Sequence, residues 1–277
     1  MNQDILIEIF KTSSLIREFE SSVYERVEKK ILRGPVYLCA GQEYISSTLA
    51  FFFRKVKLKL QLFPQHRCHG TYISFGGDID SLILELLGKN NGCAGGYGGS
   101  ASVHSVEANI YGHDGLMGSN APIGVGMAFG NKLSTLIFLG DAAAEEDYVL
   151  AAMGWAATKK LPVGFVVEDN NLSILTEKSI RRSWSIAKVG ESFGLNAMDI
   201  SDDPKVIYDA LNKLKFPFVL NINTVRKFWH AGAGIDDVNA FDRHENIANL
   251  LPKDVVEEIT KKNKELINQK WSDLIDS

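Results

Sequence analysis

Two polar residues, each following a run of apolar residues, are the part of this sequence with the clearest chemical use. Asp141 follows the apolar run that ends at Gly140, and Asn170 follows a second apolar run, 29 residues after Asp141. The residues between them, Glu145 to Lys160, have the pattern of a helix that returns the chain for a second, parallel strand. We therefore expect the two side chains to meet at the carboxyl ends of a parallel sheet, where open α/β sheets bind their ligands.

A carboxylate beside an amide oxygen, with neither His nor Cys next to them, suits a hard cation. Mg²⁺ and Ca²⁺ prefer oxygen ligands and leave coordination positions open for phosphate oxygens. The helix that begins just after Asp141 would also offer the backbone N–H groups of Ala142 and Ala143 to an anion. Asp141 could instead be only the cap of that helix, but a cap alone would not require Asn170. The pair therefore favours a metal and phosphate site.

The unit from Gly140 to Asn171 resembles the thiamine-diphosphate-binding motif, in which Gly-Asp-Gly is followed at this distance by an Asn pair. It resembles most the alpha subunit of the decarboxylating component of 2-oxo acid dehydrogenase complexes, over about residues 5 to 236. The other segments that agree with this subunit are Arg17-Glu18-Phe19-Glu20, Gly41-Gln42-Glu43, His66-Arg67-Cys68-His69-Gly70, Gly98 to His104 and Tyr111 to Gly118. Six motifs in one order make the resemblance far more specific than any single motif.

The resemblance implies a site for thiamine diphosphate and its metal ion. The groups implied to bind the metal, Mg²⁺ or Ca²⁺, are Asp141, Asn170 and the carbonyl of Leu172. The residues implied to contact the cofactor itself are His66, Arg67, Gly115, Met117, Asp141, Ala142, Ala143, Asn170, Leu172 and His230. Of these, Arg67 and His230 would face the diphosphate, and Gly115 and Met117 the aminopyrimidine ring.

Three histidines are candidates for catalysis. His230 lies four residues after Arg226, as does the second His of the family's Arg-x-His-Gly-His-Ser segment, and its imidazole could shuttle protons to a substrate-derived oxygen near neutral pH. The alternative is a histidine packed beside Trp229 in a loop. His69 and His104 belong to two of the matching motifs, and we expect them to line the pocket.

Four positions depart from the family. Tyr37 stands where pyruvate-using relatives carry His, so the resemblance does not extend to pyruvate as the substrate. His66 replaces a Tyr, either as an added titratable group or as a structural histidine. Ala142 replaces a Gly and would be strained if the turn required a positive φ. Ala231 replaces a Ser that some relatives phosphorylate, so we do not expect control by phosphate at this position.

The family's activating Glu, which bonds the pyrimidine ring of the cofactor, belongs to a separate beta subunit. The resemblance therefore implies an obligate beta partner in an α₂β₂ assembly, with the cofactor at the subunit interface. The small residues of the segment Asn120 to Lys132 suit close contact with that partner or, equally, packing within this chain. The substrate would be a 2-oxo acid, and the sequence leaves open the acceptor of the acyl or aldehyde unit, which in complex-forming relatives is the lipoyl group of an acyltransferase. A two-subunit, transketolase-like carboligase of sugar or secondary-metabolite synthesis and a non-catalytic scaffolding subunit are the alternatives.

One α/β domain over residues 1–277 would position these groups, with a doubly wound parallel sheet and helices on both faces. The predicted strands are 135–139, 163–167 and 218–223. The predicted helices are 4–32, 43–53, 80–87, 120–132, 145–160 and 204–214, followed by a short helical C-terminal tail over about 238–277. A polar loop after Pro64 would carry His66, Arg67 and His69. A glycine-rich loop over 92–118 is long enough to be functional.

Length and composition are compatible with this fold. A chain of 277 residues with 45% hydrophobic content can bury a full core. A formal net charge of −4 gives no reason to expect nucleic acid as a partner. We expect no membrane span and no signal peptide, because long apolar runs and a basic start are both lacking. Cys39, Cys68 and Cys93 show neither zinc-type spacing nor a disulfide framework, which predicts reduced thiols and a cytoplasmic location.

Overall fold

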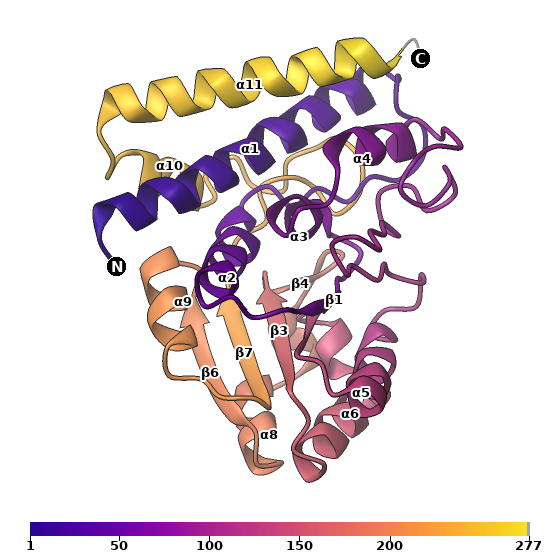
Figure 1. Ribbon diagram of the computed structural model, residues 1–277, viewed down its shortest axis with the longest axis vertical. Helices are drawn as coiled ribbons and strands as arrows, with labels where there is room; N and C mark the ends of the chain where they lie inside the picture. The colour runs from indigo at the N-terminus through magenta and orange to yellow at the C-terminus, as the bar shows by residue number, and fades with distance from the viewer. Residues whose placement is uncertain (276–277) are drawn as a thin grey trace.

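The computed structural model describes residues 1–275, and a five-stranded sheet forms its centre (Figure 1). The strand order is β1-β2-β3-β7-β6, and all neighbouring strands are parallel. The strands are β1 (Gln61–Phe63), β2 (Thr135–Gly140), β3 (Val163–Asp169), β6 (Asn196–Ser201) and β7 (Phe218–Asn223). Gly140 pairs with Glu168, so the chain leaves β2 and β3 at the same edge of the sheet.

Helices cover both faces of this sheet, which confirms the predicted doubly wound arrangement. Side chains alternate along β2, so that Leu136 and Phe138 belong to one core cluster, and Ile137 and Leu139 to another. The first face is covered by α2 (Glu43–Lys55), α3 (His69–Ser74) and α9 (Pro204–Leu211). The second is covered by α5 (Asn120–Asn131), α6 (Asp147–Thr158) and α8 (Ile186–Ser192).

A further layer of helices packs outside α2 and α3. It consists of α1 (Gln3–Glu28), α4 (Ile79–Leu86) and α11 (Lys253–Ile275), and α11 follows the short α10 (Arg243–Ala248). Helices α1 and α11 lie side by side and run in the same direction (Figure 1). The indole nitrogen of the fully buried Trp271 donates to Ser22 Oγ at 2.8 Å, and the Arg26 guanidinium lies 4.3 Å from the ring centroid. Helix α11 is therefore joined to the main core.

Several predicted boundaries shift. Helix α1 ends at Glu28, and α3 already begins at His69, which shortens the predicted polar loop. The segment after Asp141 starts as a 3-10 turn, η1 (Ala143–Glu145), before α6. Three short elements follow β3 and were not predicted: β4 (Leu172–Ser173), β5 (Thr176–Glu177) and α7 (Lys178–Arg181). Strands β1 and β6 were also missed.

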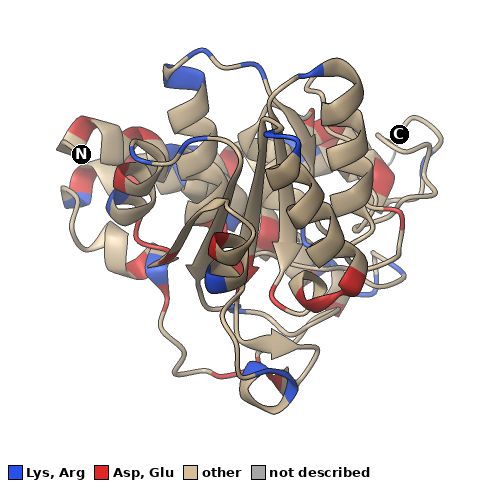
Figure 2. Cartoon of the chain, turned by 90° about the horizontal axis from the view of Figure 1, so that it is seen from below, with Lys and Arg blue, Asp and Glu red and all other residues tan. Residues whose placement is uncertain are grey.

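Charged residues lie on the helices and loops, and the central strands are almost free of them (Figure 2). The exceptions include Glu168 and Asp169, which end β3 at the edge of the sheet described above. Across residues 1–275, none of the helices combines the length and hydrophobicity of a membrane span. Cys39, Cys68 and Cys93 are free thiols, and the first two are buried.

Candidate active site

A pocket of about 290 Å³ lies at the carboxyl ends of β1, β2 and β3. Three stretches that directly follow these strands contribute to its lining. They are Gln65 to Arg67 after β1, Gly140 to Ala143 around the end of β2, and Asn170 with Leu172 to Ile174 after β3. Tyr37, Met117, Glu146 and His230 complete the wall. Asp141 and Asn170 thus lie in one pocket, as their spacing predicted.

Oxygen ligands for a cation line this pocket. Asp141 is only 2% exposed, and Asn170 and Leu172 line the same pocket. Asn170 Oδ1 accepts the backbone N–H of Leu172 at 3.1 Å, and its Nδ2 donates to Gln42 at 3.1 Å, so the amide is held in place from both ends. One carboxylate, one amide and one carbonyl suit Mg²⁺ or Ca²⁺, provided that a ligand supplies further oxygens.

The turn after Asp141 accommodates Ala142 without strain. Ala142 has φ −73° and ψ −41°, which is ordinary right-handed helical geometry, so this turn does not require glycine. Burial raises the pKa of Asp141 above its ordinary value, although hydrogen bonding to Arg181 opposes this shift. The Asp141 carboxylate is therefore paired with Arg181 of the same chain.

A buried cation lines the same pocket as these oxygens. Arg67 is 3% exposed and lines the pocket, and its guanidinium donates to the carbonyls of Leu38 at 2.8 Å and His230 at 3.3 Å. Burial lowers the pKa of Arg67 to about 10, so the side chain remains protonated at neutral pH. Within residues 1–275, no carboxylate forms a salt bridge with Arg67. A buried cation of this kind calls for an anionic ligand.

Aromatic side chains form the wall next to Arg67. The ring centroid of Tyr37 lies 4.9 Å from that of His66 and 5.7 Å from that of His230. Burial lowers the pKa of His66 to about 2 and that of His230 to about 4, and the charge of Arg67 adds to both shifts. Both imidazoles are therefore neutral at pH 7. His66 Nε2 is buried and has no hydrogen-bond partner in the described part of the chain, so His66 is not a satisfied structural histidine.

His230 is held by Arg226 in one orientation. Arg226 Nη1 donates to His230 Nδ1 at 3.4 Å, which leaves the proton of the neutral ring on Nε2. Arg226 is itself fixed by Asp236 and by the carbonyl of Ile174. An antiparallel bridge between Phe228 and Ile235 closes the glycine-rich turn that follows His230 into a short hairpin.

The expectation that His69 and His104 line the pocket is wrong. His69 is fully buried, with Nδ1 2.7 Å from Glu20 and Nε2 2.9 Å from Ser100, so both ring nitrogens are already used. His104 lies in a separate small pocket and accepts the backbone N–H of Gly112 at 3.1 Å. Both motif histidines join segments of the chain, because each one bonds a residue of the glycine-rich region.

Of the two residues expected to contact the aminopyrimidine, Met117 lines the pocket and Gly115 does not. Met117 lines the pocket and is 38% exposed, and Tyr148 Oη donates a hydrogen bond to its carbonyl. Gly115 lies outside the lining residues, and its N–H donates to His113 Nδ1 at 2.9 Å. Only Met117 therefore faces the pocket directly in this conformation.

Sequence reasoning missed a buried acid beneath the pocket. Glu168 is 5% exposed and accepts a hydrogen bond from Gln65, which lines the pocket. Burial raises the pKa of Glu168 to about 7. The available signal was a Glu within a strand that is otherwise apolar up to that point.

Glu85 was also missed, and it organises the glycine-rich loop. Its Oε2 accepts the N–H groups of Ala94 and Gly96 at 2.7 and 2.9 Å, and its Oε1 those of Gly98 and Gly99 at 2.7 and 3.0 Å. One buried carboxylate thus fixes a loop that lacks regular secondary structure.

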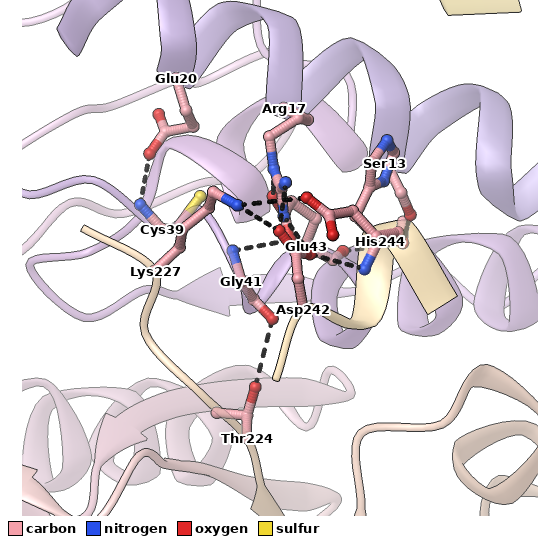
Figure 3. Close-up of polar contacts among 12 residues, drawn as sticks. Ser13, Arg17, Glu20, Cys39, Gly41, Glu43, Thr224, Lys227, Asp242 and His244 are labelled. Carbon is pink, nitrogen blue, oxygen red and sulfur yellow. Dashed lines mark hydrogen bonds and ion pairs between the residues drawn. The ribbon is translucent and has the colours of Figure 1, made fainter. Parts of the chain in front are cut away.

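A buried ion network anchors the segment that carries His230, and two of the sequence motifs meet in it (Figure 3). Arg17 of α1 forms a salt bridge with Glu43 of α2 and two hydrogen bonds of 2.9 Å with Asp242. Lys227 also pairs with Asp242, at 2.5 Å. The network therefore fastens the segment 224–242, which carries His230, to the first two helices.

Gly41 permits a close approach of backbone at this point. It has φ +97°, and a Cβ atom there would lie 2.1 Å from the carbonyl oxygen of Val225. The Gly41 N–H donates to Glu43 at 2.9 Å, and the N–H of Lys227 donates to Ala40 at 2.8 Å. In the Gly-Gln-Glu motif, Gly41 thus allows the close backbone contact, Gln42 is the partner of Asn170, and Glu43 forms the ion pair with Arg17.

The fold and the pocket define an α/β protein with the architecture of thiamine-diphosphate enzymes. The structure of transketolase from Campylobacter jejuni superposes with a TM-score of 0.62 over 100% of this chain and 49% of that one, at 16% identity, which shows the shared fold.

The family follows from the sequence comparison. Residues 11–268 match the model of the family described as dehydrogenase E1 component, and the chain belongs to this family. It is 30% identical over 271 residues to the pyruvate dehydrogenase E1 component subunit alpha of Rickettsia bellii, which spans 92% of this chain and 81% of the relative. The mitochondrial alpha-1 subunit of the same enzyme from Arabidopsis thaliana is 27% identical over 270 residues, covering 92% of this chain and 68% of the relative.

Proposed function

We propose that this chain is the alpha-type subunit of a thiamine-diphosphate-dependent 2-oxo acid dehydrogenase, which decarboxylates a 2-oxo acid and passes the acyl unit to an acceptor. One observation carries the proposal: the buried Arg67 lines the same pocket as the oxygen set formed by Asp141, Asn170 and Leu172. A cation without a salt-bridge partner and a set of oxygen ligands in one pocket match a diphosphate with its metal ion. The family membership supports the same reading.

The residues of the pocket divide into groups that would hold different parts of the cofactor. Asp141, Asn170 and the Leu172 carbonyl would bind Mg²⁺ or Ca²⁺. Arg67, His66 and His230 would face the diphosphate, together with the N–H groups of Ala142 and Ala143 at the start of η1. Met117 would support the thiamine rings, and the backbone of Gly115 would contact the aminopyrimidine after a local rearrangement.

Thiamine diphosphate, when bound, supplies the carbon nucleophile and the electron sink for the loss of CO₂. The chain would contribute proton transfer and exclusion of water. His230 has its Nε2–H available, since Arg226 occupies Nδ1, so it can donate a hydrogen bond to an oxygen of the substrate. A bound diphosphate would raise the pKa of His230 from its low value, because a nearby negative charge stabilises the imidazolium.

The proposed substrate is stated as a class, the 2-oxo acids. Tyr37 stands beside His66 and His230 where pyruvate-using relatives carry a His, so the part of the pocket that contacts the acyl group differs from theirs. The relatives support a dehydrogenase over a carboligase, because the likeness to transketolase concerns the fold alone. Retention of Asp141, Asn170 and Arg67 in one pocket argues against a purely scaffolding subunit.

A beta-type subunit would complete the site by supplying the activating Glu, in an α₂β₂ assembly. The surface proposed for this contact is the outer side of α5 and α6. Ile123 and Phe129 on α5 are 52% and 45% exposed, and Gly126 and Gly130 have open space where a Cβ atom would lie. Trp155 of α6 packs against Phe129, with ring centroids 4.7 Å apart. The final acceptor would be the lipoyl group of an acyltransferase, and the cytoplasmic location remains a prediction.

The test is a calorimetric titration of thiamine diphosphate with Mg²⁺ into this chain, alone and mixed with its beta-type subunit. Binding that appears mainly in the mixture supports a shared site, and turnover of 2-oxo acids by the mixture then tests the reaction. Absence of binding in both samples, with a folded chain and a formed complex, would refute the proposal. It would favour the alternative, a non-catalytic scaffolding subunit.

A further inference from the structure

A compact unit after β3 carries one proposed metal ligand, Leu172, and an arginine that pairs with another, Asp141. Strands β4 and β5 pair as a two-stranded hairpin, and α7 follows directly. The N–H of Lys178 donates to the Asn171 carbonyl at 2.9 Å, and that of Arg182 donates to the Lys178 carbonyl at 2.9 Å. We call residues 172–182 the α7 unit. It begins at Leu172, next to Asn170.

Three cations of the α7 unit face three acids at the edge of the sheet. Lys178 forms a salt bridge with Asp169, and Arg181 bridges Asp141 and Glu145. Arg182 is buried and donates to the Asp141 carbonyl at 3.3 Å. The unit is thus held on the pocket by charge as well as by backbone hydrogen bonds.

Arg181 occupies one carboxylate oxygen of Asp141, which is a proposed metal ligand. Its Nη2 is hydrogen-bonded to Asp141 Oδ2 and its Nη1 to Glu145 Oε1. The side chains of Arg181 and Asp141 are 14% and 2% exposed, so water screens this pair much less than it screens a surface pair. While Arg181 keeps this contact, a divalent cation bound to Asp141 would lie close to the guanidinium, and the repulsion between the two positive charges would oppose metal binding.

We propose that Arg181 is a resident counter-ion of Asp141, which a metal ion must displace when it enters with the cofactor. This proposal rests on the function proposed above. The displacement concerns the Arg181 side chain, and the backbone hydrogen bonds of the α7 unit and the Lys178–Asp169 salt bridge are retained. The apparent metal affinity is then reduced by the fraction of molecules in which Arg181 covers Asp141. Removal of Arg181 should therefore tighten metal binding, in contrast to removal of an ordinary binding residue.

The experiment measures metal binding directly. Mn²⁺, which electron paramagnetic resonance detects, is titrated into the full chain mixed with the beta-type subunit at saturating thiamine diphosphate. Arg181→Met is expected to lower the dissociation constant of Mn²⁺ about tenfold, the equivalent of ~1.4 kcal/mol. Arg181→Lys keeps the charge but cannot bridge both carboxylates, so its constant should lie between those of wild type and Arg181→Met.

Lys178→Met is the matched control. It removes the same charge from the same unit, but its partner Asp169 is not a proposed metal ligand, so the constant should stay close to the wild-type value. An unchanged or raised constant in folded Arg181→Met overturns the proposal. If Arg181→Met does not fold, an Arg181→Lys constant at or above the wild-type value overturns it. If wild type binds neither Mn²⁺ nor thiamine diphosphate, the proposed function itself fails and this inference falls with it.

Discussion

Replacement of Arg17 by Met should destabilise the chain far more than loss of an ordinary surface charge. Arg17 forms a salt bridge with the fully buried Glu43 and two hydrogen bonds of 2.9 Å with Asp242. Lys227 would still pair with Asp242, but Glu43 would keep only the N–H of Gly41 among these contacts. Breaking a buried ion pair by removing one partner typically costs about 3–5 kcal/mol, because the other charge remains buried. We expect a loss of that size.

Urea unfolding of the purified chain at pH 7, followed by circular dichroism, measures this loss. Lys11→Met is the matched control on the same helix, since Lys11 pairs with Glu8 and both side chains are about half exposed. Loss of that pair should cost at most about 1 kcal/mol. An Arg17→Met variant no less stable than the control would refute the assignment of the network as a structural anchor.

The pH dependence gives a second check on the same variant. Burial alone would raise the pKa of Asp242, but Arg17 and Lys227 hold it well below its ordinary value. A carboxyl group with a lowered pKa in the folded state stabilises the fold above its unfolded pKa of about 4, and this contribution is lost as the pH falls further. The difference in the free energy of unfolding between wild type and Arg17→Met should therefore be largest at pH 7 and shrink in acid. A difference that grows on acidification would contradict the reasoning.

Three further predictions concern the pocket. Asp141→Ala or Asn170→Ala should abolish Mg²⁺-dependent binding of thiamine diphosphate in the calorimeter while circular dichroism stays native, and wild-type affinity would disprove the metal assignment. His230→Ala should lower kcat more than it weakens cofactor binding, and unchanged steady-state kinetics would reduce His230 to a packing role. Because burial raises the pKa of Glu168 to about 7, its ionisation should cost stability as the pH rises from about 4.5 to above 7. The Tm of Glu168→Gln should therefore rise relative to that of wild type between pH 5 and pH 8. A Tm difference that stays constant over this range would count against the raised pKa of Glu168.

The central strands were predictable because burial on both faces leaves a direct mark on the sequence. The runs at 135–139 and 163–167 are continuous and apolar, and the structure buries them in parallel between two helical layers. Strand β6 leaves no such mark, since Asn196–Ser201 is a partly exposed edge strand that contains polar residues and pairs only with β7. Strand β1 spans just three residues, which is too short for a periodic signal.

The pocket was predictable where its residues directly follow strands, as Asp141 and Asn170 do. Motif membership was a weaker guide, because it does not separate residues that contact a ligand from residues that position others. His69 shows this, since its buried ring joins Glu20 to Ser100. The contact of Arg181 with Asp141 could not be predicted, because it joins residues 40 positions apart through a hairpin that has no sequence signature.

The parallel packing of α1 against α11 has a consequence for biosynthesis. Phe19 of α1 stacks on Trp271 of α11, with ring centroids 6.5 Å apart, so α1 is covered by a helix that is translated long after it. The nascent chain therefore carries an uncovered apolar stripe of α1 while the residues between the two helices are translated, and this part of the core can close only after α11 has left the ribosome. A partner subunit that required the closed core could accordingly bind only after α11 has been made, and until then the apolar stripe would be accessible to chaperones.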